Sequence, residues 1–244
     1  TKNDGVSQGC FTSFNFGLHV NDPKDTVVEN RELLASKLEF SKTKWVCSEQ
    51  VHGNNVVKVT NKDCGKGVTD YESGIETTDG FYTNEENILL TSCYADCVPL
   101  YFLESTSKFI GLAHAGWKGT VQNIGGRVIE KWIKEENLQL KNIQVAIGPS
   151  IGDCCYEVDD FVMNKLNDAF EHKIPNNILT TLENGKFKLN LKEANKQLLI
   201  RSGISEENII MTNYCTSCNP NLFFSHRRDG GKTGRMMSYI GWRN

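Results

Sequence analysis

The chain contains 244 residues with a formal net charge of −3, and 39% of them are hydrophobic and 23% charged. This composition predicts an ordinary globular protein with a full core, organised as one domain over residues 1–244. The weak negative charge gives no electrostatic footprint for nucleic acid or an anionic membrane, and no window holds the run of about 18 apolar residues that a membrane span needs.

The N-terminal part predicts a short extended segment followed by a helix. Residues 11–18 are rich in phenylalanine, and Asp22-Pro23 is a helix start, with Asp at the cap and Pro at the first helical position. Apolar residues then recur at helical spacing as far as Leu38, and Arg31 lies in the middle of that stripe. A guanidinium there must find carboxylates or carbonyls, or face a ligand in a cleft.

Two short strands, residues 45–49 and 55–59, are predicted to meet at a bend occupied by His52. The polar residues 61–78 form a long surface loop, which the turn dipeptide Asp79-Gly80 closes.

The most apolar stretch of the chain predicts two neighbouring strands. Residues 88–94 form a buried strand that stops before Pro99, and residues 100–103 continue in extended form. Residues 108–113 form the next strand, which runs into a glycine-rich turn at His114. Adjacent strands that end together would bring Cys97 close to His114.

His52, Cys97 and His114 therefore form a candidate cluster. Two imidazoles and one thiolate are the ligands of an open zinc site, whose fourth position is left for water or substrate. The same donors suit copper. A metal-free alternative is that Cys97 is a nucleophile and His114 its base, oriented by Asp96 or a backbone carbonyl.

The second half of the chain alternates helices and strands without the regular spacing of βα repeats. After Gly119 a helix is predicted whose free N–H groups would point toward His114 and suit an anion. The fold class is therefore mixed α/β (α+β), a single layered domain of mixed sheets flanked by helices. The predicted elements are helices at 122–136, 158–170 and 189–202, strands at 143–147, 208–214 and 236–240, and a variable loop at 175–185.

The nine cysteines are an odd number in a chain too large to need disulfides, which predicts a cytoplasmic protein with free or metal-bound thiols. Cys215 and Cys218 have the spacing of half a structural zinc site, which Cys154 and Cys155 could complete. Adjacent cysteines are poor partners on one tetrahedron, so packing or turn roles are predicted for these four.

Several motifs in fixed order resemble the YfiH family and, within it, the Bacillus-type branch called YlmD. Members of the family have been described as polyphenol oxidases or laccases, and later as zinc-containing purine nucleoside phosphorylases with adenosine deaminase activity. The resemblance spans essentially the whole chain. Its motifs are QVHG at 50–53, ADCVP at 95–99, HAGWKG at 114–119, IGPSIG with CCYEV at 147–158, CTSC at 215–218 and SHRRDGGKTGR at 225–235.

The resemblance implies that His52, Cys97 and His114 hold zinc and that Arg31 takes part in turnover. It implies phosphorolysis of adenosine, inosine, guanosine or S-methyl-5′-thioadenosine to base and pentose-1-phosphate, with deamination of adenosine as a second activity. The arginine fork suits Arg31 to a phosphate or ribose contact. Further substrate contacts are predicted for Lys118, His226, Arg227 and Arg228.

Two other functions remain open at this point. A copper-dependent polyphenol oxidase would need several coppers, and therefore many more histidines than the five present. A metal-independent cysteine hydrolase or deamidase would use Cys97 and His114 directly.

Overall fold

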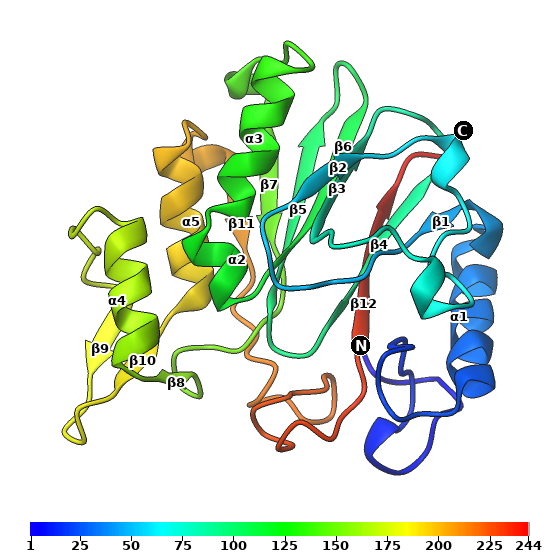
Figure 1. Cartoon of the computed structure of the whole chain (residues 1–244), viewed down its shortest axis with the longest axis horizontal. Helices are drawn as coiled ribbons and strands as arrows, with labels where there is room; N and C mark the ends of the chain where they lie inside the picture. The colour runs from blue at the N-terminus through cyan, green and yellow to red at the C-terminus, as the bar shows by residue number, and fades with distance from the viewer. Residues whose placement is uncertain (244) are drawn as a thin grey trace.

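Six strands form the central sheet of the structure, a computed structural model that describes residues 1–243 (Figure 1). The strand order is β11-β7-β5-β6-β3-β2. β5 pairs antiparallel with both β6 and β7, and β6 with β3, whereas β11–β7 and β2–β3 are parallel pairs. The strands are β2 (Val56–Lys58), β3 (Gly80–Thr83), β5 (Val98–Glu104), β6 (Phe109–Ala115), β7 (Gln144–Ile147) and β11 (Ile209–Met211).

Two smaller sheets complete the strand structure. In the first, β4 lies between a parallel neighbour, β1, and an antiparallel one, β12. The second has the order β8-β10-β9. Their strands are β1 (Trp45–Val46), β4 (Leu89–Tyr94), β12 (Met236–Gly241), β8 (Glu157–Val158), β9 (Leu179–Thr181) and β10 (Phe187–Leu189).

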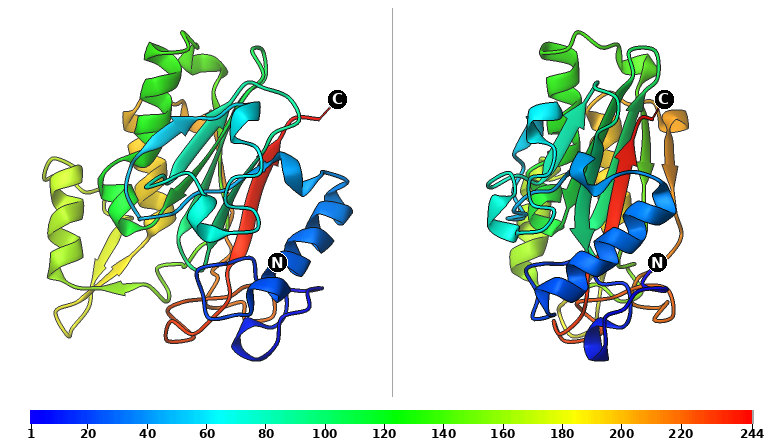
Figure 2. Two further views of the ribbon diagram at one scale, coloured as in Figure 1. Left: turned by 45° about the vertical axis from the view of Figure 1, so that its right-hand side comes forward. Right: turned by 90° about the vertical axis from the view of Figure 1, so that its right-hand side faces the viewer.

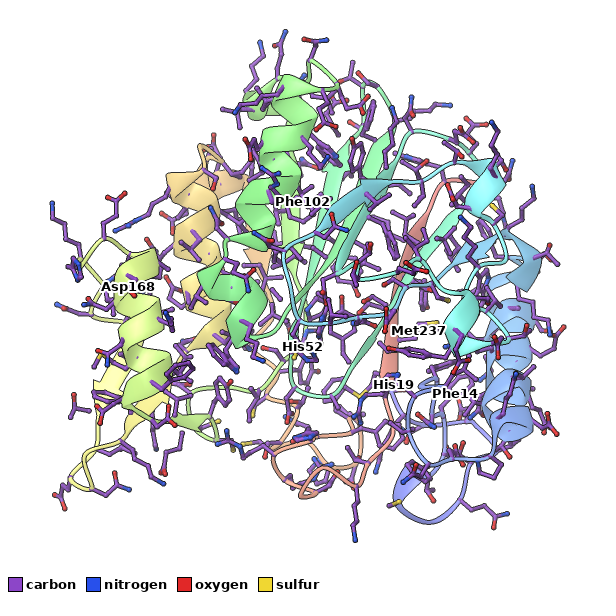
Figure 3. All side chains as sticks on the ribbon, in the orientation of Figure 1. Phe14, His19, His52, Phe102, Asp168 and Met237 are labelled. Carbon is purple, nitrogen blue, oxygen red and sulfur yellow. The ribbon has the colours of Figure 1, made fainter. Side chains whose placement is uncertain are left out.

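The helices flank the sheets on two sides (Figures 1 and 2). α1 lies beside β1, while α2 to α5 gather at the other side of the molecule. The ring centroid of Trp132, on α3, lies 6.0 Å from that of Phe102, on β5, and both residues belong to the largest core cluster. Phe102 is labelled in Figure 3. The structure thus confirms the mixed α/β class. The helices are α1 (Lys24–Leu38), α2 (Trp117–Val121), α3 (Ile124–Lys134), α4 (Asp160–Ala169) and α5 (Leu191–Arg201).

Within residues 1–243, none of the helices combines the length and the hydropathy that crossing a bilayer requires.

The helix predicted over 122–136 is confirmed as α3, and a second, shorter helix, α2, precedes it. Asn123 takes a left-handed backbone (φ 53°), which ends α2, and its side chain accepts a hydrogen bond from the Gly126 N–H at 3.0 Å to start α3. α2 was not predicted; it begins at Trp117 and has only five residues. The helix that begins just after His114 is therefore the short α2, whose dipole is smaller than that of the longer helix predicted nearby.

Three other predicted elements also differ. Residues 11–18 lie outside every strand, although Phe14 and Phe16 are buried in the N-terminal core. Pro23, not Asp22, is the cap of α1, since the Asp22 carboxylate accepts hydrogen bonds from Ser7 and Asn15 at 2.7 and 2.8 Å. The loop at 175–185 contains β9.

The register of three strands determines where the site lies. β5 and β6 pair Pro99 with His114, so Cys97, just before β5, lies beside the end of β6. Pro99 is the second residue of a strand that was predicted to begin after it. β3 and β6 pair Gly80 with Ala113, so Asp79 lies against His114, whose N–H donates to the Asp79 carbonyl at 2.7 Å.

Candidate active site

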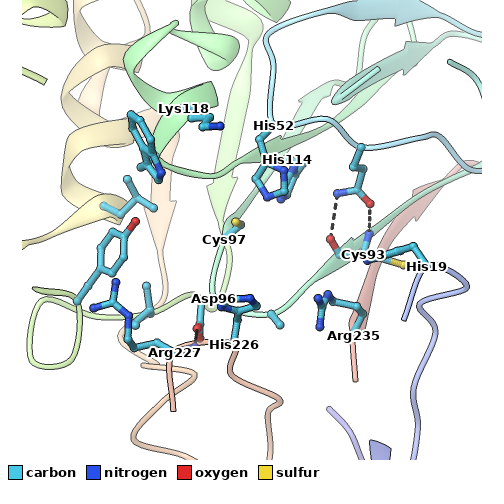
Figure 4. Close-up of a pocket in the computed structure, with 16 residues that line it drawn as sticks. His19, His52, Cys93, Asp96, Cys97, His114, Lys118, His226, Arg227 and Arg235 are labelled. Atoms are coloured by element: carbon cyan, nitrogen blue, oxygen red, sulfur yellow. Dashed lines mark hydrogen bonds between the residues drawn. The ribbon is translucent and has the colours of Figure 1, made fainter. Parts of the chain in front are cut away.

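The structure brings together the three residues of the predicted cluster. The ligand atoms of His52, Cys97 and His114 lie within 4.8 Å of one another, and the two imidazole rings are 4.7 Å apart (Figure 4). His114 is buried at the end of β6, Cys97 is half-buried, and His52 is exposed in the loop between β1 and β2. Donors on a zinc tetrahedron are roughly 3.3–3.8 Å apart, so the cluster has the dimensions of a metal site.

Asp79 orients the cluster. Its buried carboxylate lies 2.8 Å from Nδ1 of His114 and accepts the backbone N–H groups of Val51, His52 and Gly53 at 3.2, 3.1 and 2.7 Å. A proton on Nδ1 of His114 leaves the Nε2 lone pair free for a ligand. One carboxylate therefore sets the tautomer of His114 and holds the loop that carries His52.

Two backbone features keep the cluster close together. His52 takes a left-handed backbone with φ 62°. At Gly116, a Cβ atom would lie 3.0 Å from both the Cys97 Sγ and the His52 Cδ2, so a larger residue there would push these two side chains away from their positions. The Gln50 amide also exchanges hydrogen bonds of 2.7 and 3.0 Å with the Cys93 backbone, which ties the His52 loop to β4 (Figure 4).

The electrostatics of the cluster favour a thiolate beside a charged imidazole. Burial alone would raise the pKa of Cys97, but His114 and His52 outweigh it and lower that pKa to about 6. Burial alone would lower the pKa of His114, yet Cys97 and Asp79 raise it to about 9. Burial works against ionisation of Asp79 too, but His114 and the backbone N–H groups lower its pKa.

A cavity of about 460 Å³ opens over the cluster, a size typical of small-molecule sites. Three cations line it, and within residues 1–243 none of them forms an ion pair with a carboxylate. Arg227 stacks 5.1 Å from the Tyr156 ring, Lys118 lies 5.8 Å from the Trp117 ring, and Arg235 donates to the Thr233 and Gly234 carbonyls. Unpaired cations beside aromatic walls suit an anionic group joined to a flat ring. These cations are Lys118, Arg227 and Arg235.

Arg31 does not line this cavity. It is 3% exposed, and its guanidinium donates to the carbonyls of Phe16, Gly67 and Val68 at 2.6 to 3.2 Å. Two environments were predicted for Arg31: protein carboxylates or carbonyls, or a ligand in a cleft. The structure shows the first, with carbonyls as the partners. Arg31 thus fixes the N-terminal segment and the 61–78 loop to α1, outside the lining of the cavity.

Arg228 does not line the cavity either, whereas the neighbouring His226 and Arg227 do. Its guanidinium pairs with Asp229 at 2.7 Å and donates to the carbonyls of Thr216, Ser217 and Phe223.

Asp96 was a candidate to orient the imidazole, but it serves another purpose. Its carboxylate accepts the hydroxyls of Thr216 and Ser225 and the backbone N–H of Arg227, at 2.5, 3.0 and 2.7 Å. The residue that orients His114 is Asp79.

Several residues of the site were not predicted from the sequence. Asp79 was predicted only as a turn residue, and Arg235 belonged to a motif without an assigned role. His19 and Arg235 both line the cavity. The wall also contains two aromatic rings that no pattern singled out, Trp117 and Tyr156.

The four remaining clustered cysteines are also brought together. The sulfur atoms of Cys154, Cys155, Cys215 and Cys218 lie within 4.8 Å of one another, outside the cavity lining. The separate packing and turn roles predicted for them do not describe this arrangement.

Comparison with known proteins places this site in a family. The family model described as multi-copper polyphenol oxidoreductase laccase matches residues 1–243. The purine nucleoside phosphorylase YlmD of Geobacillus stearothermophilus is 46% identical over 243 residues, covering 100% of this chain and 88% of the relative. The crystal structure of YlmD from the same organism has a TM-score of 0.97 at 45% identity, covering 100% of this chain and 90% of that one. That of the Bacillus licheniformis protein YfiH has a TM-score of 0.96 at 43% identity, with 100% and 91% covered.

Proposed function

We propose that this chain, which belongs to the YfiH family of laccase-like proteins, is a zinc-dependent purine nucleoside phosphorylase. Residues 1–244 would form its one catalytic domain. One observation carries this proposal: the three metal donors lie in the same cavity as three cations that have no carboxylate partner in residues 1–243. The activity named for the relatives suits a cavity lined by cations, because it transfers the pentose of a nucleoside to phosphate and releases the base.

His52, Cys97 and His114 fit a zinc ion. Two nitrogens and a sulfur are donors that zinc prefers, the Asp79 contact frees Nε2 of His114, and Gly116 leaves room beside the sulfur. Bound there, zinc would keep one position open and act as a Lewis acid toward a substrate oxygen.

The cations would bind phosphate. In phosphorolysis, a phosphate oxygen forms a bond to C1′ of the ribose as the glycosidic C–N bond breaks, and the bonding electrons leave with the purine. The Arg235 fork matches two phosphate oxygens, and burial, the largest influence on it, lowers its pKa, as expected for a guanidinium short of counter-charge. Lys118 and Arg227 would supply further positive charge.

The aromatic walls would hold the purine. Trp117 and Tyr156 line the cavity, and flat rings are the surfaces on which a base stacks. The departing purine must take up a proton, and His226, also in the lining, is our candidate donor. The proposed substrates are adenosine, inosine, guanosine and S-methyl-5′-thioadenosine. Arg31, being buried, would act only by positioning the segments around the site.

A second activity is proposed for the same cavity, the hydrolytic deamination of adenosine. Here water replaces phosphate as the nucleophile: its oxygen bonds to C6 of the purine and ammonia leaves, giving inosine. His52 is exposed, so water reaches the cluster. Ammonia released from adenosine in the absence of phosphate would establish this activity.

The test of the main proposal is phosphate-dependent release of hypoxanthine from inosine. We expect ribose-1-phosphate in equal amount, loss of both products in His52→Ala and Cys97→Ala, and full activity in Cys10→Ser, a matched exposed thiol. Hypoxanthine released equally well without phosphate would contradict it. Activity that survives chelation would instead favour a Cys97–His114 hydrolase, and phenol-dependent oxygen uptake that rises with copper loading would favour the oxidase.

A further inference from the structure

Four cysteines meet where the chain leaves β7 and β11, and we call them the four-cysteine cluster. Cys154 and Cys155 lie between β7 and β8, whereas Cys215 and Cys218 follow β11. β7 and β11 are parallel neighbours, and a bridge between Ser150 and Cys215 extends their pairing past the strand ends. The register of the central sheet therefore brings two distant segments together.

The sulfur spacing is that of a metal tetrathiolate. All four sulfurs lie within 4.8 Å of one another, with Cys218 Sγ 3.5 Å from Cys154 Sγ and 3.4 Å from Cys155 Sγ. Zinc–sulfur bonds of about 2.3 Å would place the sulfurs of a regular tetrahedron about 3.8 Å apart. A disulfide of about 2.05 Å is far shorter, and all four cysteines are free.

The backbone around the cluster supports the thiolate form of one of the four sulfurs, that of Cys215. The Gly152 N–H donates to Cys215 Sγ at 3.2 Å, and the Cys218 N–H also hydrogen-bonds to that sulfur. A Cβ atom at Gly152 would lie 3.2 Å from Cys154 Sγ, so the absence of a side chain there keeps the sulfurs together. Amide donors aimed at sulfur are the outer-shell contacts that metal-bound thiolates use.

A buried cation lies on the same side. Lys192 is 6% exposed, and its ammonium donates to the carbonyls of Thr212 and Tyr214 at 2.9 and 2.8 Å, in the segment that leads into Cys215. Four thiolates around a divalent cation carry a net charge of −2, which a nearby ammonium partly offsets.

We propose that the four-cysteine cluster is a second metal site that binds zinc as a closed, structural tetrathiolate. Four protein ligands leave no coordination position open for water or substrate. This site would therefore stabilise the fold and would not be catalytic. Its role follows from its position, because each of the two segments it joins continues into the wall of the cavity. Tyr156 follows the first pair of cysteines, and His226 and Arg227 follow the second.

Zinc content per chain tests the proposal. With protein made under reducing, zinc-replete conditions, we expect two zinc ions in the wild type and one in Cys215→Ser/Cys218→Ser. His52→Ala/Cys97→Ala should also retain one, and Cys10→Ser should keep two. In His52→Ala/Cys97→Ala, cobalt(II) in place of zinc should give a thiolate-to-cobalt charge-transfer band. The intensity of this band should correspond to several thiolate ligands. If His52→Ala/Cys97→Ala holds no metal, the second site does not exist, whatever the fate of the phosphorylase activity.

A measurement on the wild type covers the case in which the serine variant fails to fold. Native alkylation followed by peptide mass spectrometry should find the four cysteines protected and Cys10 modified, and chelation should expose all of them. Exposed cluster thiols that react as fast as Cys10 before chelation would overturn the proposal, as would disulfides between the two pairs.

Discussion

The Asp79 carboxylate lies 2.8 Å from Nδ1 of His114, and neither side chain is more than 3% exposed. The same carboxylate accepts three backbone N–H groups from the loop that carries His52. Two of the three proposed zinc ligands are therefore held by one side chain that is not itself a member of the donor cluster. Such outer-shell carboxylates fix the tautomer and the direction of an imidazole.

Asp79→Asn should weaken zinc binding by about 10- to 100-fold, because an amide holds the Nδ1 proton of His114 less strongly and its NH₂ group cannot accept the loop N–H groups. Competition with a zinc chelator, in a background of Cys215→Ser/Cys218→Ser, would measure the change. The matched control is Asp70→Asn, an exposed aspartate paired with Lys24. Unchanged affinity in Asp79→Asn would remove the role given to Asp79.

Zinc affinity at the His52, Cys97 and His114 site should depend on pH. The pKa of Cys97 is lowered to about 6 and that of His114 is raised to about 9, so between these values the metal-free site holds a thiolate and a protonated imidazole. Zinc needs both groups deprotonated, so binding releases the His114 proton. Affinity should thus rise about tenfold per pH unit from 6 to 9 and then level off. Calorimetry in buffers of different ionisation enthalpy would count the proton, and affinity that is flat across this range would contradict the assignment.

The sequence predicts those parts of the site that follow from strand ends. Cys97 and His114 flank apolar runs that read as neighbouring strands, and His52 occupies a bend between two more. The contact of Asp79 with His114 was not predicted, because an Asp-Gly pair is also typical of an ordinary turn. Only the pairing of β3 with β6 shows that Asp79 lies beside His114.

The other differences depend on long-range register or on partners. The four-cysteine cluster exists because β7 and β11 are parallel neighbours, which no local spacing reveals. Arg31 had two permitted environments, and only the folded chain supplies the carbonyls of Phe16, Gly67 and Val68 that select one. Arg227 and Arg228 are adjacent in the sequence, yet only the first faces the cavity.

Arg31→Lys should lower the free energy of unfolding by about 2–4 kcal/mol, because one ammonium cannot span the three carbonyls and leaves buried acceptors unsatisfied. Denaturant unfolding would measure this loss. Lys37→Gln, an exposed position on the same helix paired with Asp4, should change stability by less than about 0.5 kcal/mol. In the protein that remains folded, the KM for phosphate should be unchanged, since Arg31 lies outside the cavity lining. A raised KM with full stability would instead return Arg31 to the phosphate site.

Arg235→Gln should have the opposite effect: weaker use of phosphate with little change in stability. Its guanidinium lines the cavity without a carboxylate partner in residues 1–243, so its removal costs a charge-assisted contact with phosphate but little folding energy. A contact of this kind contributes about 1.5–3 kcal/mol, which corresponds to a roughly 10- to 150-fold loss of kcat/KM for phosphate in inosine phosphorolysis. Arg235→Lys should lose less, since it keeps the charge but not the fork, and Arg127→Gln, an exposed arginine paired with Glu130, should lose nothing. Equal phosphate dependence in Arg235→Gln and the wild type would show that phosphate binds elsewhere.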